Sequence, residues 1–140
     1  MRQTPATTFL ETAADDDTFM IQTVLQVKQG QAGIEFGLQD EAGAVLAMLA
    51  VDEGPQGLVK LTDAEGATVA DRRWLLTPGR EYRLRLVVVR EMIEIYVDDV
   101  LAIDFFLPRL RPGQVTLVGK GDATFKTVEY RSGLTNKQAP

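Results

Sequence analysis

The sequence predicts an all-β protein built as a two-sheet antiparallel β-sandwich. Runs in which apolar and polar residues alternate recur from residue 18 to about residue 131, and turn residues separate them at intervals of roughly 8–12 residues. No long stretch shows the apolar period of roughly 3.6 residues that indicates a helix. These features are typical of a sandwich or a barrel. A sandwich is favoured because the apolar faces suffice for two sheets and nothing indicates a ligand-filled lumen.

Size and composition fit one soluble domain. The chain has 140 residues, of which 45% are hydrophobic and 25% are charged, close to the average for globular domains. A chain of this length buries about 68–70% of the surface that it exposes when unfolded, so one core is sufficient. We therefore predict a single domain over residues 1–140, with residues 1–6 and 134–140 as flexible tails.

Charge and missing residue types exclude several function classes. The net charge is −5 and the basic residues are scattered, which argues against nucleic acid and membranes as partners. The chain has no His, so His-dependent triads and His-based zinc sites are excluded. It has no Cys, so cysteine usage does not indicate a compartment. No apolar run reaches signal-peptide or transmembrane length, which predicts a soluble chain of unknown localisation.

The first half of the chain contains several strand patterns. Two alternating runs are expected to be separated by a turn at QGQAG, residues 29–33. Their predicted inward residues are Phe19, Ile21, Leu25, Val27, Ile34, Phe36 and Leu38. AVLAMLAV, residues 44–51, is apolar on both faces, as in a strand that is covered on both sides. Its composition would also suit a short helix, and its length favours a strand. GLVKLTD and ATVAD follow as weaker strands.

The second half shows a stronger alternation. Tyr82, Leu84, Leu86 and Val88 are predicted to point inward, and the arginines between them outward. Residues 91–102, EMIEIYVDDVLA, continue the pattern. The intervening Arg-Glu pair suits a two-residue turn poorly, so a longer loop is expected there. DVLAIDFF, GQVTLVGK and ATFKTVEYRS supply the last strands, with PRLRPG as a connector.

Two segments carry a family resemblance. PGREYRLRLVVVREMIEIYVDDVLAIDFFLP and RPGQVTLVGKGDATFKTVEY resemble the C-terminal β-sandwich of family 32 glycoside hydrolases, of the levanase and invertase type, and related concanavalin A-like carbohydrate-binding modules. TVLQVKQGQAGIEFGLQD resembles their Gly-apolar-x-Phe strand more loosely. The resemblance implies a lectin-like jelly roll that binds sugar termini or packs against a catalytic propeller. Sugar-binding relatives often carry an arginine directly after the aromatic residue, where this chain has Gly37.

The spacing of the carboxylates argues against catalysis. Glu94 and Asp98 are four residues apart on one expected strand, so their α-carbons would lie roughly 13 Å apart. Glycosidase carboxyl pairs need about 5–5.5 Å or about 6.5–9.5 Å. A partner from another strand, such as Glu35, would shorten the gap only if that strand were adjacent. We predict that the chain is not an enzyme. The two carboxylates are also explained as cross-strand ion-pair partners of Arg83 and Arg85.

Saccharide recognition combines an apolar ring face with planar hydrogen-bonding side chains. The predicted ligand-binding residues are Glu35, Trp74, Arg83, Arg85, Glu94 and Tyr96. Trp74, the one tryptophan, is expected either to cap a terminal sugar or to plug the end of the core.

No cofactor and no metal site are predicted. Asp15, Asp16 and Asp17 form an acidic run for which calcium is the best-fitting cation, because only oxygen ligands are available. The run lacks the EF-hand spacing, so a solvated turn is the favoured interpretation.

The sequence therefore predicts a non-catalytic accessory module of glycoside hydrolase type that binds a saccharide weakly. Its partners would be a saccharide or an adjoining catalytic domain. The alternative is a structural or protein-interaction sandwich that has no ligand and forms a homodimer through an open sheet face. The doubly apolar run at residues 44–51 would support that alternative if the strand were uncovered in the monomer.

Overall fold

The described part of the chain is all-β. The computed structural model describes residues 7–9, 17–39 and 42–133, and the predicted tails at residues 1–6 and 134–140 lie outside it. Its strands are β1 (Thr7–Phe9), β2 (Thr18–Gln39), β3 (Gly43–Ala50), β4 (Leu58–Thr62), β5 (Thr68–Arg73), β6 (Glu81–Val89), β7 (Met92–Val97), β8 (Val100–Phe106), β9 (Leu110–Arg111) and β10 (Thr116–Ser132). None of the described residues forms a helix that is long and apolar enough to cross a membrane.

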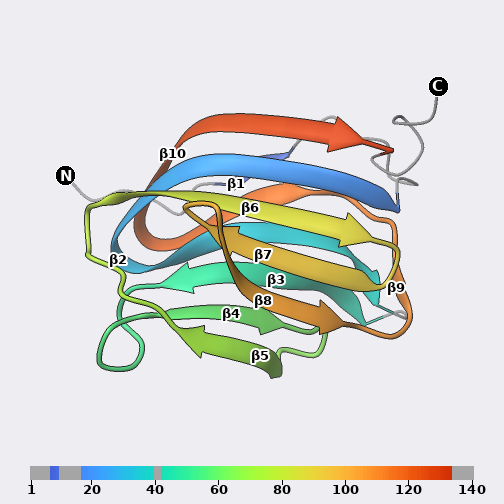
Figure 1. The fold of residues 1–140 in the computed structure, drawn as a ribbon, viewed down its shortest axis with the longest axis horizontal. Helices are drawn as coiled ribbons and strands as arrows, with labels where there is room; N and C mark the ends of the chain where they lie inside the picture. Colours follow the sequence, from blue (N-terminus) through green and yellow to red (C-terminus); the bar gives the residue numbers. More distant parts are fainter. Residues whose placement is uncertain (1–6, 10–16, 40–41, 134–140) are drawn as a thin grey trace.

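The strands form two antiparallel layers, as predicted. Sheet 1 has the order β5, β4, β3, the second half of β2, the first half of β10 and β1. Sheet 2 has the order of the second half of β10, the first half of β2, β6, β7 and β8. Strand β9 pairs with the end of β2. The two long strands therefore belong to both sheets, and Figure 1 shows them curving together at the same end of the molecule.

Two glycines allow β2 and β10 to bend together. Gly30 and Gly121 face each other in the ladder, with φ of 88° and 116°. A Cβ atom on Gly30 would lie 2.1 Å from the carbonyl oxygen of Lys120, so a side chain has no room there. The predicted turn at residues 29–33 is therefore wrong. The chain passes from one sheet into the other without reversing its direction, and the last two predicted strands are likewise one strand, β10.

The core lies between the two sheets. The predicted inward residues of β6, from Tyr82 to Val88, are at most 4% exposed. Leu38 is the exception among the predicted inward residues, since 46% of it is exposed. Gly37 precedes it with a φ of 67°, and the pairing of β2 with β3 is irregular here, so the alternation is lost.

Strand β3 is mostly buried on both faces within the single chain. Val45, Ala47 and Leu49 belong to the core, and Met48 and Ala50 on the other face are 1% exposed. The predicted strand is confirmed. Ala44 and Leu46 remain partly exposed on the outer face, so the burial of the strand removes most, but not all, of the support for a dimer interface.

The turn between β6 and β7 is shorter than expected. Val89 pairs with Met92, so only Arg90 and Glu91 form the turn. Arg90 adopts a φ of 58°, which is unfavourable for a residue with a side chain. Hydrogen bonds from other segments hold the turn: the N–H of Arg90 donates to the carbonyl of Asp17, and the carboxylate of Glu91 accepts from the N–H of Arg109. Tertiary contacts thus override the weak turn preference.

Candidate functional site

Four of the six predicted ligand-binding residues meet on the outer face of sheet 2. Arg83 and Arg85 lie on β6, and Glu94 and Tyr96 lie on β7. Cross-strand pairing places Arg85 between Gln22 of β2 and Tyr96. These five residues are called the polar face. They point outward because their sequence neighbours Leu84, Leu86, Ile93, Ile95 and Val97 fill the core.

Arg85 is the best-anchored residue of the polar face. Its guanidinium lies 4.4 Å from the centre of the Tyr96 ring, a cation–π contact. It donates one hydrogen bond of 2.9 Å to Asp99 and a longer one of 3.5 Å to the side-chain oxygen of Gln22. Only 26% of its side chain is exposed. The planar group is therefore held in one orientation against an aromatic ring.

The ion-pair partner of the two arginines is Asp99, which the sequence analysis missed. Its two carboxylate oxygens accept from Arg83 and Arg85, each at 2.9 Å. The predicted pairing with Glu94 and Asp98 is wrong. Glu94 lies opposite Val87 and accepts a hydrogen bond from Tyr96, and strand β7 ends at Val97, before Asp98. Asp98 and Asp99 then form a tight turn with φ of 50° and 69°, which brings Asp99 back over the arginines. Asp98 instead accepts the backbone N–H of Arg83 at 2.8 Å.

Glu94 interacts with its own strand neighbour on the face. The hydroxyl of Tyr96 donates a 2.9 Å hydrogen bond to one oxygen of Glu94. The pKa of Tyr96 lies above its ordinary value, chiefly because of this hydrogen bond, with desolvation and the charge of Glu94 adding to the effect. Tyr96 is therefore a neutral donor at physiological pH.

Replacing Glu94 by glutamine is expected to lower the pKa of Tyr96 toward the ordinary value of about 10. Because the folded state raises this pKa, the associated stabilisation is complete below about pH 10 and disappears as the pH rises through the raised value. Titration of the tyrosine ring carbons by NMR measures the shift. Glu129→Gln is the control, since Glu129 interacts with Arg131. If the pKa of Tyr96 were unchanged in Glu94→Gln, the hydrogen bond to Glu94 would not be the cause of its raised pKa.

The polar face keeps unused hydrogen-bonding groups. Among the described residues, no partner is found for the second terminal nitrogen of Arg85, the amide nitrogen of Gln22 or the second carboxylate oxygen of Glu94. One apolar side chain lies beside Tyr96: Leu101 pairs with it and is 39% exposed. Leu101 was not among the residues that the sequence predicted for this face. The arrangement offers donors, an acceptor and apolar surface together.

Glu35 does not belong to the polar face. It lies in the half of β2 that pairs with β3 and β10, on the outer side of sheet 1. There it lines a hollow of about 430 Å³. Because Glu35 and Glu94 lie on outer faces of different sheets, they do not form the cross-strand carboxyl pair that the sequence left open.

Trp74 lies directly after β5, away from both of these places. It is partly buried and packs against the core, and the guanidinium of Arg72 lies 5.7 Å from its ring centre. Arg72 also donates a 3.4 Å hydrogen bond to the carbonyl of Ala102 in β8, where the free edges of the two sheets approach each other. The position matches the core-plugging alternative given for Trp74.

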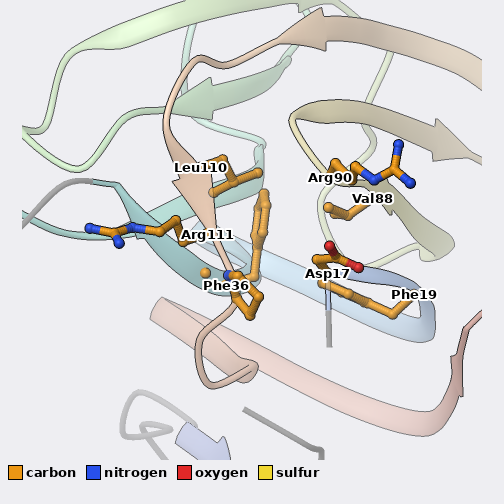
Figure 2. Close-up of a pocket in the computed structure, with 9 residues that line it drawn as sticks. Asp17, Phe19, Phe36, Val88, Arg90, Leu110 and Arg111 are labelled. Atoms are coloured by element: carbon orange, nitrogen blue, oxygen red, sulfur yellow. The ribbon is translucent and has the colours of Figure 1, made fainter. Parts of the chain in front are cut away.

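A small apolar pocket lies at the end of the sandwich where β2 begins. Its volume is about 10 Å³, room for about one water molecule. Phe19, Phe36 and Leu110 are among the residues that line it, and Figure 2 shows the side chains of Arg90 and Arg111 pointing away from it in opposite directions. A sugar ring does not fit this pocket.

No cluster of three or more metal-ligating side chains occurs within the described ranges. Asp15 and Asp16 of the acidic run lie outside those ranges. Asp17 is exposed, and its carboxylate accepts a 3.2 Å hydrogen bond from the hydroxyl of Thr18. The interpretation of the run as a solvated turn therefore stays a prediction.

Solved structures of similar shape include sugar-binding proteins. The carbohydrate-binding module CBM66 from Bacillus subtilis is 21% identical, with a TM-score of 0.70 over 91% of this chain and 95% of its own. The galectin LEC-6 of Caenorhabditis elegans is 16% identical, with a TM-score of 0.64 over 92% and 91%. The alginate lyase AlgAT5 of polysaccharide lyase family 7 is 9% identical, with a TM-score of 0.62 over 94% and 63%.

The chain has the jelly-roll β-sandwich fold. The predicted fold class is thereby confirmed. No protein-family model matches the sequence, and no curated protein matches it. At these identities the likeness concerns the fold, which is shared by binding modules and by a lyase alike.

Proposed function

We propose that the protein is a non-catalytic carbohydrate-binding module that holds a saccharide weakly on the polar face of sheet 2. The observation that carries the proposal is the anchored stack of Arg85 on Tyr96, with free hydrogen-bonding groups around it. Fixed planar groups lose little side-chain entropy when a ligand binds. The similarity in fold to a carbohydrate-binding module and to galectins supports the same class of ligand.

Chemistry assigns roles to three residues of the polar face and to the neighbouring Leu101. The free nitrogens of Arg85 and Gln22 would donate to sugar hydroxyls, and the free oxygen of Glu94 would accept from one. Leu101 would pack against the C–H groups of the ring. The face is open and the groups are few, so binding is expected to be weak, with a Kd of roughly 0.1–1 mM.

The experiment is calorimetric titration with short fructan, xylan and glucan oligosaccharides. At least one series is expected to bind saturably, and Arg85→Ala is expected to weaken binding at least tenfold. Arg80→Ala is the matched control. The guanidinium of Arg80 lies 5.4 Å from the ring centre of Tyr82, so this variant removes a comparable cation–π contact that is not on the polar face. Equal affinities of the two variants would contradict the assigned site, and the absence of binding by every series would contradict the function.

The proposal extends to an accessory role beside a glycoside hydrolase. The resemblance of residues 78–108 and 111–130 to the C-terminal sandwich of family 32 enzymes supports this role. An accessory module raises the local concentration of its enzyme on the polysaccharide. Fusing this chain to a glycosidase that hydrolyses the bound polysaccharide should therefore increase activity on that polysaccharide, and fusing the Arg85→Ala variant should not.

A further inference from the structure

The hollow beside Glu35 is a second concave feature that the polar face does not use. It lies on the outer side of sheet 1, at the end of β2, and has a volume of about 430 Å³. This volume falls within the range of about 300–1,000 Å³ found for small-molecule sites. Its lining residues are Glu35, Gly37, Leu38, Ala44, Pro112, Gly113, Gln114 and Thr116.

A close contact between two glycines builds the wall of the hollow. A Cβ atom on Gly113 would lie 2.8 Å from the backbone carbon of Gly37, so the loop of residues 112–114 rests directly on β2. Gly37 has a φ of 67°, and a Cβ atom there would lie 2.8 Å from the side chain of Leu110. A side chain at this position would require Leu110 to move and would adopt a strained left-handed backbone conformation. The loop is held in place by backbone packing.

Two polar side chains of the hollow have no partner among the described residues. Glu35 is partly buried, and neither its carboxylate nor the exposed side chain of Gln114 has a hydrogen-bond or ion-pair partner among the described residues. Leu38, 46% exposed, and the ring of Pro112 supply apolar surface beside them. A partly buried carboxylate without a partner favours a ligand that donates hydrogen bonds.

These features select a class of ligand. A free carboxylate disfavours anions, and none of the described residues that line the hollow is aromatic, as a site for a bulky organic cation would need. Adjacent hydroxyl groups of a sugar ring can donate to both oxygens of one carboxylate, while the ring's C–H groups pack on apolar side chains. The size suits a single sugar residue better than an extended chain.

We infer that the hollow is a second saccharide site, which takes one terminal sugar ring with Glu35 as the acceptor for two of its hydroxyls. The inference rests on the proposed function, since it assumes the same class of ligand. The polar face and the hollow lie on outer faces of different sheets, so the module would be bivalent. It would bridge two chain ends of a branched polysaccharide and bind such a polymer more tightly than either site binds a single end.

The test is a ¹⁵N-HSQC titration of the full chain with the methyl glycosides of fructose, xylose and glucose. At least one glycoside is expected to shift the amide signals of Gly37, Gly113 and Gln114 saturably. Glu35→Gln keeps the shape of the side chain and removes its charge, and it is expected to raise the Kd at the hollow at least tenfold. Gln114→Ala, at an exposed loop position, should also weaken binding there without affecting the fold.

This experiment tests the polar face and the hollow separately. Arg85→Ala should leave the shifts around the hollow unchanged, and Glu35→Gln should leave oligosaccharide shifts at Arg85 and Tyr96 unchanged. Shifts at the polar face with none at the hollow would overturn the second site alone. Shifts at the hollow with none at the polar face would support it and would overturn the site assigned in the proposed function. Binding at the hollow that survives both Glu35→Gln and Gln114→Ala would overturn the roles given to these residues.

Discussion

Gly30→Ala is expected to destabilise the protein by about 2–5 kcal/mol. The left-handed conformation at a φ of 88° costs a residue with a side chain about 1–2 kcal/mol. The new Cβ atom would also lie 2.1 Å from the carbonyl oxygen of Lys120, so β10 must move. Forcing atoms into a packed region adds about 1–3 kcal/mol. Urea unfolding followed by circular dichroism measures the loss.

Gly66→Ala separates the two contributions. Gly66 has the same φ of 88°, and no atom outside its immediate chain neighbours lies within 4 Å of the position that a Cβ atom would take. It should therefore lose only the conformational part, about 1–2 kcal/mol. If Gly30→Ala and Gly66→Ala lost equal stability, the close approach of β2 and β10 at the bend would not be the constraint that we describe.

Phe36→Ala is expected to destabilise the protein by about 3–5 kcal/mol. Phe36 is fully buried and belongs to the core cluster between the two sheets. It also lines the small apolar pocket, so removing its ring would enlarge an existing cavity that the neighbouring strands cannot readily close. The free energy of unfolding, again from urea titration, measures the effect.

Phe106→Ala provides the comparison at an exposed phenylalanine. Phe106 is 53% exposed at the end of β8, so its truncation should cost less than about 1 kcal/mol. If Phe36→Ala and Phe106→Ala lost similar free energy of unfolding, Phe36 would not lie in the core as described.

The sequence predicted the two layers well because the alternation is a local property. The inward residues of β6 and β7 were identified because a half-buried strand repeats every second residue. The continuity of β2 and β10 was missed because it depends on Gly30 facing Gly121, which are far apart in the chain. The same reason applies to the turn at Arg90, whose backbone is held by Asp17 and whose neighbour Glu91 is held by Arg109. Local preference cannot reveal such long-range partners.

The candidate site was predicted in part. Arg83, Arg85, Glu94 and Tyr96 were brought together correctly, since they alternate on two strands joined by a short turn. Asp99 was missed because the tight turn after Val97 reverses its direction toward the arginines. Glu35 was placed with the others although it lies on another sheet. The bend of β2 puts Glu35 in sheet 1 while Gln22 of the same strand stays in sheet 2. That bend depends on the pairing of β2 with β10, which the sequence does not show.

The central claim is that the polar face holds the saccharide. The most direct measurement is a ¹⁵N-HSQC titration with the oligosaccharide that binds best in calorimetry. We expect saturable shifts at Gln22, Arg85, Tyr96 and Leu101, and their loss in Arg85→Ala but not in Arg80→Ala. Saturable binding that leaves these four amides unshifted would contradict the claim.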